Sequence, residues 1–397
     1  MRRSTIVSLL ATCLALAAVG PATAADGEGE IIPRGMHTAT LLPDGRVLIV
    51  GGGTEDEVEI AESEVWDPAT ERSEIAGALA QTRWGHTASL LPDGRVLIVG
   101  GGSLHDPAGE KPVHHGPFSL DTAEVWSPGS GFAPAGSMAV PRRAHTATTL
   151  PDGRVLVIGG TETDEPVPAE IWDPQTAAFS ASGTPLVGRN WGHTATLLPD
   201  GRVLVVGGQG ATGVGTYEMA LEELAAAEIW DPETEMFEEA GVLDIGRVFH
   251  TASLLPDSRV LIVGGFGTDD EGMPTGFDNA VAWDPATGSF AEVATMAAVR
   301  IDHNAAVLAD GKVHISGGLG FEGERPDPEA DVGPSMLTLV ELFDPVSGEF
   351  VPAGRLQEGR QYGSSTALPD GRVVLIGGGD HDFEESAGLE IWEPPEG

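Results

Sequence analysis

HTATLLPDGRVLIVGG, the stretch from His37 to Gly52, decides the fold because seven edited copies of it follow one another along the 397-residue chain. Each copy is anchored by a histidine or, in the last copy, by a glycine: His37, His86, His145, His193, His250, His303 and Gly363. Successive anchors lie 48 to 60 residues apart, about 54 on average. A period of this length suits a repeating unit of four strands better than a helical repeat.

Each copy has the local pattern of strands and turns. The HTATLL segment is β-prone, Pro-Asp-Gly supplies a tight turn, and RVLIV reads as a buried strand that ends in a double glycine. A third strand carries the Trp-Asp-Pro motif, and an aromatic residue six positions after that aspartate marks the fourth: Phe179, Phe237, Phe290 and Phe350. Only Met219–Ala227 has a helical period, which predicts one short helix.

This pattern resembles the kelch repeat over about residues 31 to 394. The shared features are Arg-x-x-His, a hydrophobic strand, a double glycine, an aromatic residue before Asp-Pro and an aromatic residue in the last strand. The resemblance implies an all-β, seven-bladed kelch-type β-propeller with one blade per repeat around a central channel.

The seventh unit stops after Trp392-Glu393-Pro394 without a fourth strand. Residues 25–32 lie where a closing strand would sit, but Asp26–Glu30 is a poor strand former. We therefore expect the seventh blade to be incomplete, or weakly closed by this N-terminal segment.

The N-terminus predicts export. Arg2 and Arg3 precede an apolar run, Ile6–Val19, that is too short to span a bilayer, and Ala22-Thr23-Ala24 is typical of a cleavage site. Residues 1–24 are thus expected to be a secretory signal peptide, and residues 25–397 a single propeller domain. The protein is expected to be secreted, to the periplasm or the cell exterior.

The composition restricts the partners. The net charge is −40, with 61 acidic and 21 basic residues, which opposes binding to nucleic acid and to anionic membranes. Cys13, in the signal segment, is the only cysteine, so no disulfide is expected in the exported chain. We expect a monomer without a membrane span.

The residues that repeat are predicted to be structural. A histidine copied into six blades is more suited to bonding a neighbouring blade than to catalysis, and the repeated tryptophans should fill the core between blades. Ser258 replaces the turn glycine in the fifth copy, at a cost of about 1 kcal/mol if the turn requires a positive φ. An arginine three residues before each anchor gives a near-complete ring: Arg34, Arg83, Arg142, Arg247, Arg300 and Arg360. The fourth copy departs, with Asn190 at that position beside Arg189.

Arginines mixed with aromatic residues near the channel mouth suit a sugar ring or a peptide. The ligand-binding candidates are Arg83, Trp84, Arg189, Trp191, Arg247, Phe249, Arg300, Arg360 and Tyr362. Ion pairing of each arginine with nearby acidic groups is the alternative reading.

Two further groups break the repeat. The sixth copy holds Asp302, His303 and Asn304, with His314 and Ser316 where other copies carry apolar residues, so Asp302, His303 and His314 are the catalytic acid–base candidates. Locally satisfied hydrogen bonds are the alternative. His105, Asp106, His114 and His115 are the metal-binding candidates, although their spacing matches no strict metal motif and a solvated loop is the alternative.

The main functional expectation is a non-enzymatic interaction module that binds a protein or glycan on the loop face of the propeller. One alternative is a carbohydrate-active enzyme of the epimerase, mutarotase or lyase type with its acid–base residues in the sixth blade. Another is a calcium-dependent envelope or matrix protein. No cofactor other than calcium is expected. The resemblance also extends to copper-radical oxidases similar to galactose oxidase, which need a tyrosine crosslinked to a cysteine; with Tyr217 and Tyr362 as the only tyrosines, that activity is expected to be excluded.

Overall fold

The computed structural model describes residues 31–395, except 55–57, 104–117, 162, 164, 213–219, 270, 324–332 and 380–387. The predicted signal peptide and residues 25–30 of the predicted closing segment lie outside this described part. No helix in the described ranges is long and apolar enough to cross a membrane.

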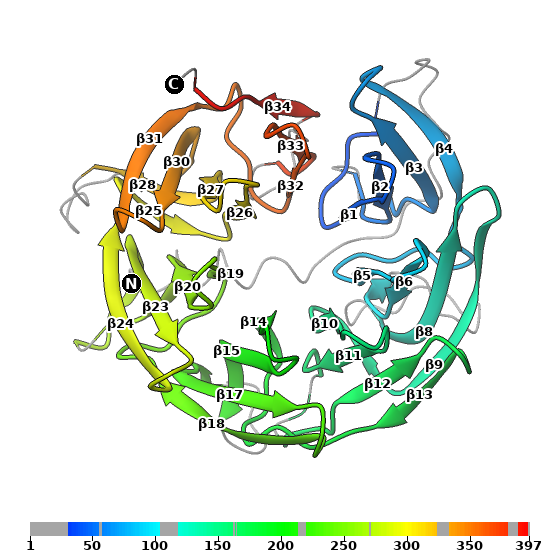
Figure 1. Ribbon diagram of the computed structural model, residues 1–397, viewed down its shortest axis with the longest axis horizontal. Coiled ribbons are helices and arrows are strands. Elements are labelled where there is room, and N and C mark those ends of the chain that lie inside the picture. The colour runs from blue at the N-terminus through cyan, green and yellow to red at the C-terminus, as the bar shows by residue number, and fades with distance from the viewer. Residues whose placement is uncertain are drawn as a thin grey trace.

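The described chain is all-β and consists of antiparallel sheets. Each repeat forms one principal sheet, here numbered sheet 1 to sheet 7 in chain order, and Figure 1 shows these sheets following one another around a ring. The first strands of neighbouring sheets contact one another at every junction, including the junction between sheet 7 and sheet 1. The short helix predicted for Met219–Ala227 is wrong in its described part, because Ala220–Glu223 and Ala226–Asp231 are strands.

Sheets 1 to 4 are built as follows. Sheet 1 contains β1 (Thr38–Leu41), β2 (Val47–Val50), β3 (Glu62–Asp67) and β4 (Arg72–Ala78). Sheet 2 contains β5 (Thr87–Leu90), β6 (Val96–Val99), β7 (Gly102–Ser103), β8 (Phe118–Ser127) and β9 (Gly131–Arg142). Sheet 3 contains β10 (Thr146–Thr149), β11 (Val155–Ile158), β12 (Glu170–Asp173) and β13 (Ala178–Ala181). Sheet 4 contains β14 (Trp191–Leu197), β15 (Val203–Thr212), β16 (Ala220–Glu223), β17 (Ala226–Asp231) and β18 (Met236–Val242).

Sheets 5 to 7 complete the ring. Sheet 5 contains β19 (Thr251–Leu254), β20 (Val260–Val263), β23 (Asn279–Asp284) and β24 (Ser289–Thr295). Sheet 6 contains β26 (Asn304–Val307), β27 (Val313–Ser316), β30 (Leu339–Asp344) and β31 (Glu349–Arg355). Sheet 7 contains β32 (Ser364–Ala367), β33 (Val373–Ile376) and β34 (Glu390–Trp392). Two small sheets pair β21 (Phe266–Thr268) with β22 (Pro274–Gly276), and join β25 (Ala298–Ile301), β28 (Leu319–Glu322) and β29 (Ser335–Met336).

The second strand of each sheet explains why the sheets pack face to face. In β2 every residue of Val47–Val50 is buried, and side chains of successive residues point to opposite faces. Leu48 and Val50 pack in the cluster shared with sheet 2, whereas Val47 and Ile49 pack in the cluster shared with sheet 7. A strand buried on both faces needs an apolar run, which is what RVLIV supplies.

The repeated tryptophans fill the space between neighbouring sheets, as predicted. Trp66, Trp126, Trp172, Trp230, Trp283 and Trp392 are all at most 6% exposed. Most of their indole nitrogens donate across the interface; the Trp172 nitrogen, for example, donates to the Ala135 carbonyl at 2.9 Å. Trp126, Trp172, Trp230, Trp283 and Trp392 therefore combine apolar burial with a hydrogen bond between two sheets.

Ser258 occupies a left-handed position, with φ of 72°, whereas the other copies carry glycine there, such as Gly45 at 87°. A Cβ added at Gly45 would meet no atom within 4 Å, so the conflict at Ser258 is one of backbone conformation and not of space. We expect Ser258→Gly to raise the free energy of unfolding by about 1 kcal/mol in urea titrations. The control is Gly45→Ser in the equivalent turn of the first copy, which should lower the free energy of unfolding by a similar amount. Equal stability of the native protein and both variants would contradict the argument.

Sheet 7 has three strands in the described part of the chain. It is joined to sheet 1 by the Met36 N–H, which donates to the Tyr362 carbonyl, and by the Gly378 N–H, which donates to the Arg34 carbonyl. Ile31 packs against the core that sheets 1 and 7 share. The described first and last sheets are thus in direct contact.

Candidate active site

One residue of each repeat lies directly before the anchor, and most of these residues are hydrogen-bonded through the backbone to their counterparts in the neighbouring repeats. Among these residues Met36, Ala144, Phe249, Asp302 and Tyr362 have φ between 52° and 59°, and Gly85 and Gly192 are also left-handed. Several are linked in sequence by backbone bonds: the Asp302 N–H donates to the Phe249 carbonyl, and the Met36 N–H donates to the Tyr362 carbonyl. These residues define the inner ring, and a non-glycine residue held there in a strained conformation is a candidate for function.

The anchor histidines form a belt just behind the inner ring. In each case Nε2 shares a hydrogen bond of 2.8 to 3.2 Å with a hydroxyl of the preceding sheet: Thr38, Thr87, Thr146, Thr194, Thr251 or Ser364. Burial, together with the positive charge of the neighbouring arginine, lowers the pKa of His37 and His145 to about 3. The histidines are therefore neutral links between sheets, as the sequence predicted.

The belt is interrupted between sheets 6 and 7. Gly363 stands where the other copies have histidine, and Asn304 stands where five other copies have the threonine that bonds this histidine. The Asn304 Nδ2 is buried and has no hydrogen-bond partner in the described structure. This junction is chemically different from the six others.

Asp302 lies on the inner ring beside this interruption. The residue is partly exposed, whereas its Oδ2 atom is buried and has no partner among the described residues. Burial raises the pKa of Asp302 to about 6, and a hydrogen bond from the Gln361 side chain opposes that rise. A carboxyl group with this pKa can exchange a proton near neutral pH.

The other two acid–base candidates do not join Asp302. Nε2 of His303 bonds the Thr251 hydroxyl at 2.9 Å, so this histidine belongs to the belt. His314 has no exposed surface, and its ring lies 4.7 Å from the Trp392 ring in sheet 7. Burial lowers the pKa of both to about 3. The structure thus separates the three residues and leaves Asp302 as the one at the inner ring.

The candidate arginines lie inside the protein. Arg83, Arg189, Arg247, Arg300 and Arg360 are at most 3% exposed, and Arg34 and Arg142 are fully buried. All but Arg247 form an ion pair with the glutamate two residues before the tryptophan, or its equivalent, in the third strand: Glu64, Glu124, Glu170, Glu228, Glu341 or Glu390. This geometry supports the structural alternative and gives no support to ligand binding by these paired guanidiniums.

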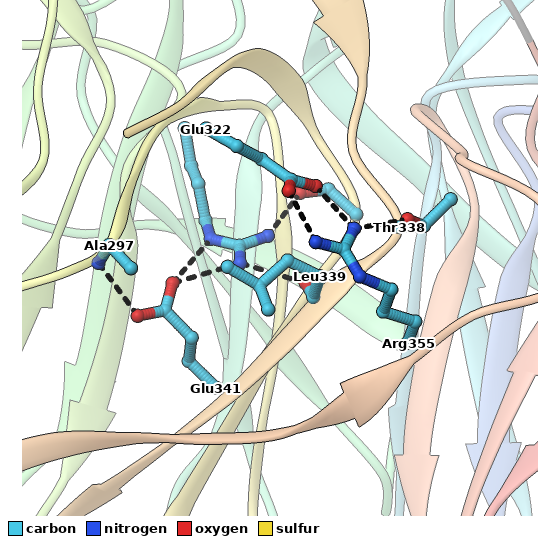
Figure 2. A network of polar contacts seen from close by, with 8 residues as sticks. Ala297, Glu322, Thr338, Leu339, Glu341 and Arg355 are labelled. Carbon is cyan, nitrogen blue, oxygen red and sulfur yellow. Dashed lines mark hydrogen bonds and ion pairs between the residues drawn. The ribbon is translucent and has the colours of Figure 1, made fainter. Parts of the chain in front are cut away.

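Sheet 6 shows how such a pair is embedded. Glu341 accepts from Arg300 at 2.9 Å and, through its other oxygen, from the Ala297 N–H at 2.8 Å. Figure 2 shows Glu341 in this network, and beside it an outer pair in which Arg355 reaches Glu322 and Thr338. The inner pair is sealed, whereas the Arg355 side chain is 56% exposed. The two pairs should therefore differ greatly in their effect on stability.

Arg247 in sheet 5 is the exception, because Val281 replaces the glutamate. Its guanidinium bonds the Gly264 carbonyl and the Asn279 side chain and lies over the Phe277 ring at 4.6 Å. Burial without a carboxylate partner lowers the pKa of Arg247 to about 10. The ring and the amide replace the missing carboxylate.

The aromatic candidates form two separate groups. The rings of Trp191 and Phe249 lie 4.9 Å apart, tilted by 37°, and both are partly exposed. Trp84 instead lies under the Arg143 guanidinium at 5.8 Å, against Gly102. Tyr362 is partly exposed on the inner ring. Trp191 and Phe249 are therefore the one pair of these candidates whose rings contact each other among the described residues.

The metal candidates His105, Asp106, His114 and His115 lie outside the described residues. Within the described ranges, no three histidine, cysteine, aspartate or glutamate side chains come together as metal ligands.

Comparisons with known proteins agree with the fold. No family model matches the chain, and no curated protein matches it. Among solved structures, a similar one is described as "Novel fungal alcohol oxidase with catalytic diversity among the AA5 family, in complex with copper". It superposes with a TM-score of 0.67 at 19% identity, over 93% of this chain and 75% of the other. The chain thus has an all-β, galactose oxidase-like fold.

This neighbour corrects three expectations. The first is that the protein is a non-enzymatic interaction module. The second is that it has no enzyme activity, with copper-radical oxidation excluded, and the third is that it has no cofactor other than calcium. All three are contradicted, because the similar structure is an oxidase in complex with copper.

The residues of this chain do not fit the copper-radical centre that the resemblance implies. Cys13 is the only cysteine, and Tyr362 is the only tyrosine in the described ranges. The belt histidines have their Nε2 atoms bonded to hydroxyl groups. We therefore derive no chemical step through copper.

Sequence reasoning missed Gln361, which bonds Asp302 from the next sheet. The sequence feature that could have indicated Gln361 is the missing anchor histidine at Gly363, two residues further on. Residues next to a missing anchor need not keep the role that they have in the other repeats.

Proposed function

We propose that the chain is a single seven-bladed kelch-type β-propeller domain, residues 25–397, exported after cleavage near Ala24. The seven repeats and the unbroken series of contacts between first strands around the ring support this reading. We also predict that the protein does not bind nucleic acid and that it is a monomer.

We propose that the protein is a carbohydrate-active enzyme that works by proton transfer, of the epimerase, mutarotase or lyase type. The observation that carries this proposal is Asp302, a partly exposed inner-ring carboxyl with a left-handed backbone and a pKa of about 6. The neighbouring rings of Trp191 and Phe249, tilted by 37° and partly exposed, offer aromatic groups of the kind that sugar rings contact.

Mutarotation illustrates the chemistry. Asp302 as carboxylate accepts the proton of the anomeric hydroxyl while the bond between the anomeric carbon and the ring oxygen breaks. The bonding electron pair moves to the ring oxygen, which takes a proton from water. Closure on the other face of the carbonyl reverses these transfers and returns the proton from Asp302. The Gln361 amide would orient the carboxylate throughout.

The test is proton NMR of neutral and charged monosaccharides incubated with the protein in D₂O, which detects both anomer interconversion and exchange at carbon. We expect Asp302→Asn to lower the rate by about 10²- to 10⁴-fold. The rate of the native protein should rise with pH through about 6, because only the carboxylate accepts a proton. Asp310→Asn, at an exposed turn, is the control and should leave the rate unchanged.

Full activity of Asp302→Asn, or a pH profile without a transition near 6 in the native protein, would refute the assignment to Asp302.

The structural neighbour favours a second candidate, copper-dependent oxidation of an alcohol. Metal analysis of the purified protein and a peroxide assay with added copper on the same substrates distinguish the two candidates.

A further inference from the structure

The junction between sheets 6 and 7 contains a cluster of polar groups with no partner in the described structure. It consists of Asn304 Nδ2, both ring nitrogens of His314, Ser316 Oγ and Ser365 Oγ, here called the seam cluster. His314 and Ser316 have no exposed surface. The Nδ1 atom of each belt histidine is unpartnered as well, whereas this junction gathers an amide, two hydroxyls and both nitrogens of one ring. Buried polar groups normally have hydrogen-bond partners, so this concentration is the basis for expecting a partner from outside the chain.

The strand register places these groups on one side of the interface. Asn304 pairs with Ser316, and Ala306 pairs with His314, so their side chains share one face of sheet 6. Ala306 packs in the core cluster that also contains Val373 and Trp392, so this face is turned toward sheet 7. In sheet 7, Ser365 pairs with Leu375 of the same core cluster and therefore faces sheet 6.

The other junctions show what normally fills this place. At each of the six others, an anchor histidine lies against the first glycine of the preceding double glycine, so closely that an added Cβ would lie 2.5 to 3.0 Å from Cε1 of the ring. At Gly317 of sheet 6 the nearest atoms are the carbonyl, Cγ and carbonyl carbon of Arg360, and no imidazole is present. Gly363 cannot supply a side chain without a shift, because a Cβ there would lie 2.8 Å from the Gly377 carbonyl oxygen.

The groups around this place determine the chemistry of its occupant. Asn304 offers an N–H donor, the two serine hydroxyls can donate or accept, and His314, whose pKa is lowered to about 3 by burial, is neutral. Charged groups of both signs flank the cluster, with the Arg360 side chain against Gly317 and Asp302 on the inner ring, so the surroundings do not favour an anion or a cation.

We propose that the seam between sheets 6 and 7 binds a small, neutral, planar molecule of imidazole size that carries a hydrogen-bond donor and an acceptor. The molecule occupies the place of the missing seventh anchor histidine, next to Gly317, and bonds Asn304, Ser316 and Ser365. This site goes beyond the proposed proton transfer at Asp302 and does not depend on it.

The test uses imidazole at pH 8, where it is neutral, with the full-length exported protein. Thermal unfolding should show a saturable rise in melting temperature with imidazole, and saturation-transfer NMR should detect its binding. Thiophene, a ring of similar size without a donor, should give neither effect. Asp302→Asn should bind imidazole normally, which separates this result from failure of the proposed enzyme activity.

Two variants complete the design. His314→Leu with Ser316→Val restores the apolar residues of the other repeats and should abolish the imidazole effect. His145→Gly removes a belt ring between sheets 2 and 3, next to Gly100 and Thr87, and should gain an imidazole-dependent rise. The proposal would be overturned if imidazole gave no saturable rise in the melting temperature of the native protein, or an equal rise in the double variant. The NMR measurement on the native protein tests the proposal even if His145→Gly does not fold.

Discussion

Acidification is expected to unfold this protein steeply between pH 6.5 and about 3. Seven buried histidines have their pKa lowered far below 6.5 by burial: His37, His86, His145, His193, His250, His303 and His314. Below pH 6.5 the unfolded chain takes up these protons while the folded chain does not. The free energy of unfolding therefore falls as the pH falls, and the loss begins at the pKa of free histidine.

The expected slope is large. Each histidine contributes about 1.4 kcal/mol per pH unit inside this window, so the seven together contribute roughly 10 kcal/mol per pH unit. Two effects oppose this loss of stability. Protonation of acidic groups reduces the repulsion within a chain of net charge −40. Asp302, whose pKa is raised to about 6, also stabilises the fold as the pH falls from 6 toward 4. A steep net loss should remain.

Urea titrations at a series of pH values measure this slope. His314→Leu has one fewer histidine and no belt bond to lose, so its slope should be smaller by about 1.4 kcal/mol per pH unit. An unchanged slope in this variant would show that His314 titrates normally, and a native protein equally stable at pH 4 and pH 7 would refute the whole argument.

The second large effect is expected from breaking a buried ion pair. Glu170→Ala should cost about 3 to 5 kcal/mol, because Arg142 would keep its charge in the interior without a carboxylate. The Ala139 N–H would also lose its acceptor, which now lies 2.7 Å away. Urea unfolding of the purified variant measures this cost.

The exposed pair Glu322–Arg355 is the matched control, and Glu322→Ala should cost at most about 1 kcal/mol. Sheet 5 gives a second comparison, since Val281 already lacks the carboxylate and Arg247 is held by Asn279 and Phe277. If Glu170→Ala and Glu322→Ala had equal effects, burial would not determine the strength of these pairs.

The repeat was sufficient to predict the strands, the turns and the buried tryptophans, because each depends on residues close together in one copy. The ion pairs were harder to predict. Arg142 and Glu170 are 28 residues apart, and the sequence shows both repeating without showing that they meet. The predicted helix near Met219 failed because pairing with β15 outweighs the local helical period.

The candidate site was only partly predictable for the same reason. Asp302 was visible as a departure from the repeat, and so was His314, whereas His303 is the anchor that five other copies share. Their separation could not be predicted, because it depends on which face of a strand each side chain takes. Gln361 lies 59 residues after Asp302, in the copy that lost its anchor, and the packing of sheet 7 against sheet 6 brings the two together.

The inward placement of the arginines has a consequence for what can approach the molecule. Seven of the 21 basic residues are buried at the sheet interfaces, and seven more are held by the aspartate of their own tight turn, as in Arg46 and Asp44. Most of these cations are neutralised by a neighbouring carboxylate, including six glutamates buried in the same pairs. The excess of acidic over basic residues therefore gives a strongly negative electric field in the solvent. If the protein acts on sugars as proposed, we expect this field to disfavour uronic acids and other anionic sugars relative to neutral or amino sugars.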